Sequence, residues 1–215
     1  QYGVETALGI ARASLAIPER YIRVGHAAPP ADAEPTEVPG CYRMPHGDPK
    51  PFRFQDISAQ AVVPLLGLQP GHTFLDLCAA PGNKTAQAIE TPVRAVAGEF
   101  HLSRARMLAP LGVPAVVLDA RHPLPFSRAF DRILIDAPCS GTGTLARNPE
   151  IKWKLESEDF AALQERQIAI LRNGLAQLAP GGVLVYSTCS LEREENEDVI
   201  AAAGATPLRT MHRLP

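Results

Sequence analysis

The sequence predicts an α/β fold in which a mostly parallel sheet is covered by helices on both faces. Short runs rich in Val, Ile and Leu alternate with longer segments whose apolar residues recur at helical spacing, and this alternation is typical of βαβ units. The short runs are almost continuously apolar, as expected for strands buried on both faces. Ligands of such sheets bind just outside the carboxyl ends of the strands, so the residues after each run are the candidate functional residues.

The chain divides into two regions. Residues 1–58 form a small N-terminal extension, in which a helix over residues 5–17 ends at Pro18 and a Pro-rich, irregular or extended arm covers residues 27–51. Residues 59–215 form the α/β domain. The chain starts with Gln-Tyr-Gly, without an initiator Met or a signal peptide, so we expect that it begins inside a longer gene product.

The α/β domain begins with a helix over residues 60–66 and a turn from Gly67 to Gly71. The strands that follow are expected over residues 73–77, 95–98, 115–118, 132–135 and 183–186. The helices are expected over residues 85–89, 103–108, 158–178 and 193–203. Gly181 and Gly182 are expected to end the longest helix.

Composition excludes several classes of protein. Of the 215 residues, 46% are hydrophobic and 20% charged, which allows a core and argues against disorder. No apolar run approaches the roughly 20 residues of a membrane span. The four cysteines lie tens of residues apart, so neither a zinc site nor a disulfide framework is expected. Free thiols are typical of a reducing compartment, so we expect a cytoplasmic location. The net charge of −2 gives no overall attraction for nucleic acid.

The loop after the first strand of the domain reads Asp76-Leu-Cys-Ala-Ala-Pro-Gly-Asn-Lys-Thr85. It is not a phosphate-binding P-loop, because Cys78 and Asn83 occupy the positions that require glycine, and it lacks the three glycines of the dinucleotide fingerprint. Its small residues allow a ligand to lie against the backbone, and the following helix offers free N–H groups.

Acidic residues follow the next three strands, at Glu99, Asp119 and Asp136. A carboxylate after the second strand accepts hydrogen bonds from a ribose diol, and one after the third strand can accept from an adenine amino group. The three acids beside the small-residue loop therefore favour an adenosine-containing ligand.

Two cysteines end two of the apolar runs, in Asp136-Ala-Pro-Cys139 and Tyr186-Ser-Thr-Cys189. Two thiols that face one pocket suit covalent chemistry on an electrophilic carbon. The alternative is that both cysteines are small buried hydrophobic residues, as most free cysteines are. Cys41 and Cys78 are interpreted as packing residues.

These motifs resemble those of the RNA cytosine-C5 methyltransferases, the Nop2/Sun/Fmu family with its RsmB-like members. The resemblance spans roughly residues 18–200 and rests on several motifs in the family's order: Pro18-Glu-Arg-Tyr-Ile-Arg-Val, Phe54-Gln55-Asp56, the loop of residues 78–85, the two cysteine motifs and Glu194-Glu195-Asn196-Glu197. It implies a Rossmann-like class I methyltransferase fold. Asn83 departs from the commoner glycine, but asparagine tolerates a positive φ. The family continues beyond the end of this chain, so we expect its final strand to be missing.

The resemblance also implies S-adenosylmethionine as cofactor and no metal. The implied cofactor-binding residues are Cys78, Ala79, Ala80, Pro81, Gly82, Asn83, Lys84, Glu99, Asp119 and Asp136. In the implied reaction, Cys189 attacks C6 of a cytosine and Cys139 acts in release. Asp136 hydrogen-bonds the base and Lys84 lines the same pocket, and the product is 5-methylcytosine. DNA cytosine methyltransferases instead use the cysteine of a Pro-Cys motif, so spacing alone leaves Cys139 open as the nucleophile.

The implied partner is rRNA or tRNA, bound by a monomer. Arg147, Lys152 and Lys154 follow the first cysteine motif and are candidates for phosphate contacts. Two other functions are kept as alternatives. One is an RNA-binding or assembly factor whose catalysis is dispensable, and the other is a DNA cytosine methyltransferase.

Overall fold

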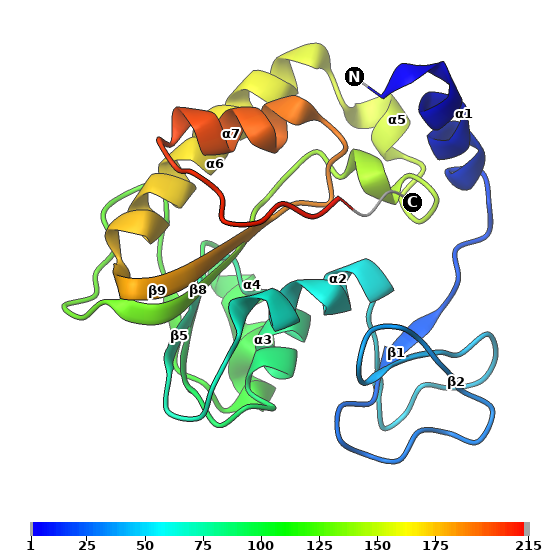
Figure 1. Ribbon diagram of the computed structural model, residues 1–215, viewed down its shortest axis with the longest axis horizontal. Helices are drawn as coiled ribbons and strands as arrows, with labels where there is room; N and C mark the ends of the chain where they lie inside the picture. The colour runs from blue at the N-terminus through cyan, green and yellow to red at the C-terminus, as the bar shows by residue number, and fades with distance from the viewer. Residues whose placement is uncertain (1, 213–215) are drawn as a thin grey trace.

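The computed structural model describes residues 2–212 and contains a five-stranded parallel sheet beside a four-stranded antiparallel sheet (Figure 1). The larger sheet has the order β7-β6-β5-β8-β9 and consists of β5 (Thr73–Asp76), β6 (Arg94–Glu99), β7 (Ala115–Val117), β8 (Phe130–Asp136) and β9 (Leu178–Ser187). The predicted α/β fold is confirmed. The strand order reverses between β5 and β8, which is where open sheets of this kind bind their ligands.

Helices cover both faces of the larger sheet (Figure 1). One face carries α6 (Ser157–Ala176) and α7 (Glu197–Ala202), and the other carries α2 (Ile57–Val62), η1 (Val63–Leu66) and α3 (Asn83–Ala88). Successive strand residues alternate between these faces, so Leu75 and Ile133 pack with Leu171 of α6 while Phe74 and Leu134 pack on the opposite side. All five side chains are almost completely buried. Within residues 2–212, no helix is long and apolar enough to cross a membrane.

The smaller sheet lies in the N-terminal region, after α1 (Gly3–Ala13). Its strands are β1 (Tyr21–Arg23), β2 (Glu34–Pro35), β3 (Cys41–Arg43) and β4 (Arg53–Phe54), in the order β2-β3-β1-β4. Two of these strands fall inside the arm that was predicted to be irregular or extended. Strands of two or three residues are too short to show an alternating pattern, and they are fixed instead by a small core around Ile22, Val24 and Met44.

Several predicted boundaries are wrong. The predicted N-terminal helix ends at Ala13. The longest helix ends at Ala176, before the glycine pair, and Gly181 and Gly182 lie inside β9. There the pairing with β8 shifts register between Phe130 and Arg132, an irregularity that glycines accommodate.

The last predicted helix is also interrupted. It consists of η4 (Arg193–Glu195) and α7, which are separated at Asn196. The Asn196 side chain donates hydrogen bonds to the carbonyls of Ser190 and Glu192, so it holds the preceding loop in place of continuing a helix. The remaining elements are α4 (Leu102–Ala105), η2 (Arg106–Leu111), η3 (Thr142–Thr144) and α5 (Ile151–Lys154).

Candidate active site

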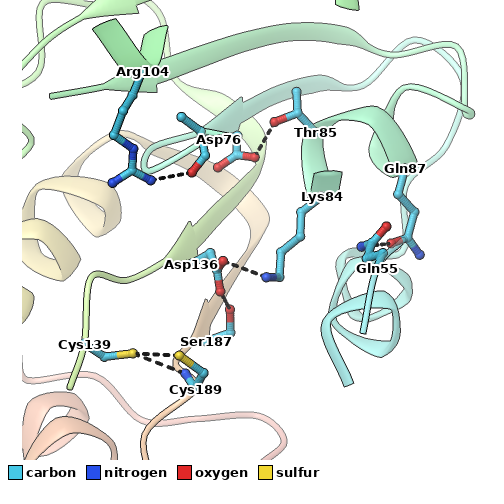
Figure 2. A network of polar contacts seen from close by, with 11 residues as sticks. Gln55, Asp76, Lys84, Thr85, Gln87, Arg104, Asp136, Cys139, Ser187 and Cys189 are labelled. Atoms are coloured by element: carbon cyan, nitrogen blue, oxygen red, sulfur yellow. Dashed lines mark hydrogen bonds and ion pairs between the residues drawn. The ribbon is translucent and has the colours of Figure 1, made fainter. Parts of the chain in front are cut away.

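The two cysteine motifs meet at the carboxyl end of the larger sheet (Figure 2). Strands β8 and β9 are parallel neighbours, and Asp136 is paired with Ser187 at their ends. The loops that follow therefore leave the sheet side by side. The Sγ atoms of Cys139 and Cys189 lie 3.3 Å apart, and the Cys189 backbone N–H donates to Cys139 Sγ over the same distance.

This contact makes the two thiols unequal. The hydrogen bond with the Cys139 thiol lowers the pKa of Cys189. Partial burial and the negative charge of Asp136 oppose this shift, and the positive charge of Lys84 assists it. The same hydrogen bond, together with burial, raises the pKa of Cys139. Cys189 is therefore the more acidic thiol of the pair, and the thiolate is the nucleophilic form, whereas Cys139 holds its proton more tightly.

A charged network lies beside the cysteines (Figure 2). Lys84, in the first turn of α3, places Nζ 2.6 Å from Oδ2 of Asp136. The Ser187 hydroxyl donates to Oδ1 of the same carboxylate over 2.8 Å. The Asp136 side chain is 38% exposed, so its carboxylate is oriented by two partners and still open to a ligand.

A buried carboxylate supports the cysteine loops from behind. Glu195 is fully buried, and its Oε1 accepts hydrogen bonds from Ser140 N and Gln167 Nε2, both at 2.9 Å. Its Oε2 accepts from the Ser140 hydroxyl, which also lies 3.1 Å from the Ser190 hydroxyl. Ser140 and Ser190 directly follow the two cysteines, so this network fixes one loop relative to the other. Sequence reasoning placed Glu195 only in an acidic tract, because its partners are distant in sequence.

A cleft of about 490 Å³ opens next to Lys84 and Asp136. From the predicted cofactor loop it is lined by Cys78, Ala79, Ala80, Pro81, Asn83 and Lys84. Gly82 is buried behind this lining with φ +100°, and a Cβ there would meet Leu108 and Leu111 at 2.9 Å. The expectation that Asn83 tolerates a positive φ is not needed, because no residue other than glycine has a positive φ in the described chain.

Two predicted acids lie outside the cleft lining. Glu99, at the end of β6, is buried and accepts hydrogen bonds from the backbone amides of Ala80 and His101. Asp119, beyond the end of β7, is bound by Arg121, whose hydrogen bonds lower the pKa of the carboxyl to about 2. They lie at the ends of neighbouring strands, as predicted, but their contacts to a cofactor stay a prediction.

Asp76, which ends β5, is a residue that sequence reasoning missed. Its Oδ2 accepts a hydrogen bond from Thr85 over 2.7 Å, whereas its Oδ1 has no hydrogen-bond partner among the described residues. Burial raises the pKa of this carboxyl to about 7. Asp76 is among the residues that line the cleft, and its buried Oδ1 is an acceptor without a partner at that place. Within residues 2–212 no group of three His, Cys, Asp or Glu side chains is placed to hold a metal ion.

The N-terminal region forms the other wall of the cleft, which the sequence did not predict. Its lining residues are Arg20, Tyr21, Phe54, Gln55 and Asp56, joined by Ala59 of α2 and by Arg147 from the loop after Cys139. Arg147 forms an ion pair of 2.6 Å with Asp56 and donates to the Glu19 carbonyl. The smaller sheet is thus tied to the cysteine loop across the cleft.

Residues 63–210 match the family described as 16S rRNA methyltransferase RsmB/F. The ribosomal RNA small subunit methyltransferase B of Vibrio cholerae is 47% identical over 152 residues, covering 66% of this chain and 35% of that protein. The protein of the same name from Klebsiella pneumoniae is 43% identical over 169 residues, covering 74% of this chain and 39% of that protein. The chain therefore spans somewhat more than a third of the length of these curated relatives.

Solved structures from Pyrococcus horikoshii are also similar. A methyltransferase homolog protein is 31% identical with a TM-score of 0.73, covering 91% of this chain and 72% of that one. NSun6, solved with SFG, an analogue of S-adenosylmethionine, is 31% identical with a TM-score of 0.63, covering 70% of this chain and 41% of that one.

Proposed function

The chain belongs to the 16S rRNA methyltransferase RsmB/F family, and from this premise we propose that it methylates RNA at cytosine C5 with S-adenosylmethionine as methyl donor. The observation that carries the proposal is the pair of thiols at 3.3 Å, in which the pKa of Cys189 is lowered and that of Cys139 is raised. Cytosine C5 is a weak nucleophile, so a reaction there needs a group that adds to C6 and a group that assists release. The two unequal thiols supply both.

The residues of the site act in order. Cys189 forms a bond from Sγ to C6 of the cytosine, which shifts electron density onto C5 and makes it nucleophilic. After C5 has gained the methyl group, its proton must leave while the Sγ–C6 bond breaks and returns its electron pair to Cys189. Once Cys189 is a thioether, the hydrogen bond to its thiolate and the thiolate charge, which raise the pKa of Cys139, are gone. Cys139 can then release its thiol proton to water, and the resulting thiolate accepts the C5 proton.

Asp136 orients the base in this proposal. Ser187 and Lys84 fix its carboxylate, and its open side accepts a hydrogen bond from the exocyclic amino group of cytosine. Uracil presents a carbonyl oxygen at that position, so the same carboxylate disfavours it. The target base reaches this position only when it is flipped out of its stack.

The cleft fits the proposed cofactor. The loop of residues 78–84 is built from small side chains that allow close approach, and the unpaired Oδ1 of Asp76 offers an acceptor to an ammonium group. When bound, S-adenosylmethionine supplies an electrophilic methyl group on a sulfonium. Glu99 and Asp119 are proposed to contact its ribose and adenine.

We favour rRNA over tRNA as substrate, because the curated relatives are named ribosomal RNA small subunit methyltransferases. We also propose that the protein is a monomer and that it acts in the cytoplasm. The alternatives are an RNA-binding assembly factor and a DNA cytosine methyltransferase. No specific observation favours either of them over the proposed RNA methyltransferase.

The test compares Cys189→Ala, Cys139→Ala and the control Cys41→Ala, a buried cysteine of the smaller sheet, with radiolabelled methyl donor and 16S rRNA. We expect Cys189→Ala to abolish 5-methylcytosine and Cys139→Ala to accumulate a covalent protein–RNA adduct that survives denaturing electrophoresis. An adduct trapped in Cys189→Ala but absent in Cys139→Ala would reverse the two roles. Methyl transfer to DNA in preference to RNA would support the DNA alternative, and RNA binding without any transfer would support the assembly factor.

A further inference from the structure

An aromatic ring and a guanidinium group form a shelf at the rim of the cleft, on the smaller sheet. The Arg20 guanidinium lies over the Phe54 ring, with its carbon 4.3 Å from the ring centroid. Strands β1 and β4 pair so that Ile22 lies opposite Phe54, which brings the residue just before β1 alongside this ring. Both shelf residues line the same cleft as Lys84 and Asp136. We call this pair the Arg20–Phe54 shelf.

The shelf is available to a ligand. Phe54 is 39% exposed, although it lies in a cleft with charged side chains. Within residues 2–212, the Arg20 side chain makes one hydrogen bond, to the Gly47 carbonyl at 3.2 Å, and no ion pair. The other arginine of the cleft, Arg147, is already neutralised by Asp56. A single exposed aromatic residue is common on protein surfaces, but an exposed ring stacked on an unneutralised cation inside a ligand cleft is a specific arrangement.

The shelf is also held at a fixed place relative to the charged network. Gln60 of α2 donates to the Ile22 carbonyl at 3.3 Å, and the Gln55 side chain donates to that of Gln87 in α3 at 3.2 Å. The ion pair between Arg147 and Asp56 is a third contact between the N-terminal region and the α/β domain. The smaller sheet is therefore fastened to the domain that carries Lys84 by contacts on several elements, and it provides a preorganised platform.

We propose that the Arg20–Phe54 shelf binds the unpaired nucleobase next to the target cytosine, with the Arg20 charge also facing the strand's phosphate. A base that leaves its stack deprives its neighbour of a stacking partner. Aromatic rings and guanidinium planes replace such a partner with little preference for sequence. This inference rests on the proposed function, because it takes single-stranded RNA as the occupant of the cleft.

The test uses a short fluorescein-labelled single-stranded RNA with a central 5-fluorocytidine, in which fluorine replaces the C5 hydrogen and blocks release. Anisotropy without S-adenosylmethionine measures the affinity. Denaturing electrophoresis at saturating RNA with S-adenosylmethionine present measures the covalent adduct, which is trapped once the methyl group has been transferred because C5 then has no proton to lose. The variants are Phe54→Leu, which keeps apolar volume but removes the ring, and Phe54→Tyr, which keeps the ring. Each is also tested with RNAs that carry an abasic nucleotide on either side of the central base.

We expect Phe54→Leu to weaken RNA affinity about ten-fold and Phe54→Tyr to bind RNA as tightly as the wild type does. An abasic nucleotide next to the central base should weaken RNA binding by the wild type but should not weaken binding by Phe54→Leu any further. The abasic nucleotide and the substitution remove the same stacking contact. The proposed role of the Arg20–Phe54 shelf would be overturned by equal RNA affinities of the wild type and Phe54→Leu. It would also be overturned if the losses of affinity caused by Phe54→Leu and by the abasic nucleotide were additive. Normal RNA affinity of the wild type without an adduct would overturn the proposed function, and the comparison of affinities would stay valid. If the wild type did not bind RNA, both the proposed function and the proposed role of the shelf would be overturned.

Discussion

Replacing Glu195 by alanine removes the carboxylate that joins the two cysteine loops. The change leaves two donors without an acceptor, the Ser140 backbone N–H and one N–H of the Gln167 side chain, whose other N–H donates to the Pro138 carbonyl. Each unsatisfied buried donor costs about 1–3 kcal/mol, while the relieved desolvation of the carboxylate offsets part of the sum. We therefore expect Glu195→Ala to lower the free energy of unfolding by about 3 kcal/mol.

The variant Glu195→Gln keeps the size and shape of the side chain and removes its negative charge. The Gln carbonyl oxygen keeps both amide donors, and its NH₂ group can donate to the Ser140 hydroxyl, which then donates to Ser190. We expect this variant to lose less than about 1 kcal/mol. The matched control is Glu194→Ala, which removes an exposed carboxylate from the same acidic tract and should change stability by less than about 0.5 kcal/mol.

The assay is urea unfolding at constant pH, with the midpoint and slope fitted for each variant. A second readout is the rate at which iodoacetamide alkylates Cys189. In Glu195→Ala the loop that carries Cys139 loses its support, so the hydrogen bond that favours the Cys189 thiolate weakens and alkylation slows. A Glu195→Ala variant as stable as Glu194→Ala, or a Glu195→Gln variant as destabilised as Glu195→Ala, would contradict the supporting role of the Glu195 hydrogen bonds.

Three further predictions follow from other contacts. Cys139→Ala should move the pH profile of Cys189 alkylation to higher pH, because the donor that lowers the pKa of Cys189 is lost, and an unmoved profile would contradict this. Gly174→Ala should destabilise the protein by about 1–3 kcal/mol in urea unfolding, since its Cβ would lie 2.7 Å from a core side chain, whereas Gly9→Ala, with open space around it, should stabilise it by about 0.5–1 kcal/mol. The native state binds a proton on Asp76 that the unfolded state releases, so wild-type stability should fall as pH rises from about 4 to about 7, and the fall should be smaller in Asp76→Asn. Equal pH slopes in the two proteins would show that Asp76 is not protonated in this range.

The tertiary structure decided the parts of the site that depend on distant contacts. Glu195 reaches Ser140 across 55 positions of the chain, and Arg147 reaches Asp56 across 91. The strands of the smaller sheet are too short for a periodic pattern, so the wall that carries Phe54 had no local signature. The glycine pair was misread as a helix end for a related reason, since its role is set by the register of β9 on β8.

The sequence by itself determined the parallel sheet and the meeting of the two cysteine motifs. Buried parallel strands must be almost continuously apolar, and that pattern is local to each strand. The carboxyl ends of parallel strands lie at one edge, so motifs that follow two strands share that edge. What only the tertiary structure decided is which thiol is the more acidic. Spacing alone leaves Cys139 and Cys189 both open as the nucleophile, and their pKa values separate because folding places the two thiols in hydrogen-bond contact beside the Lys84 charge.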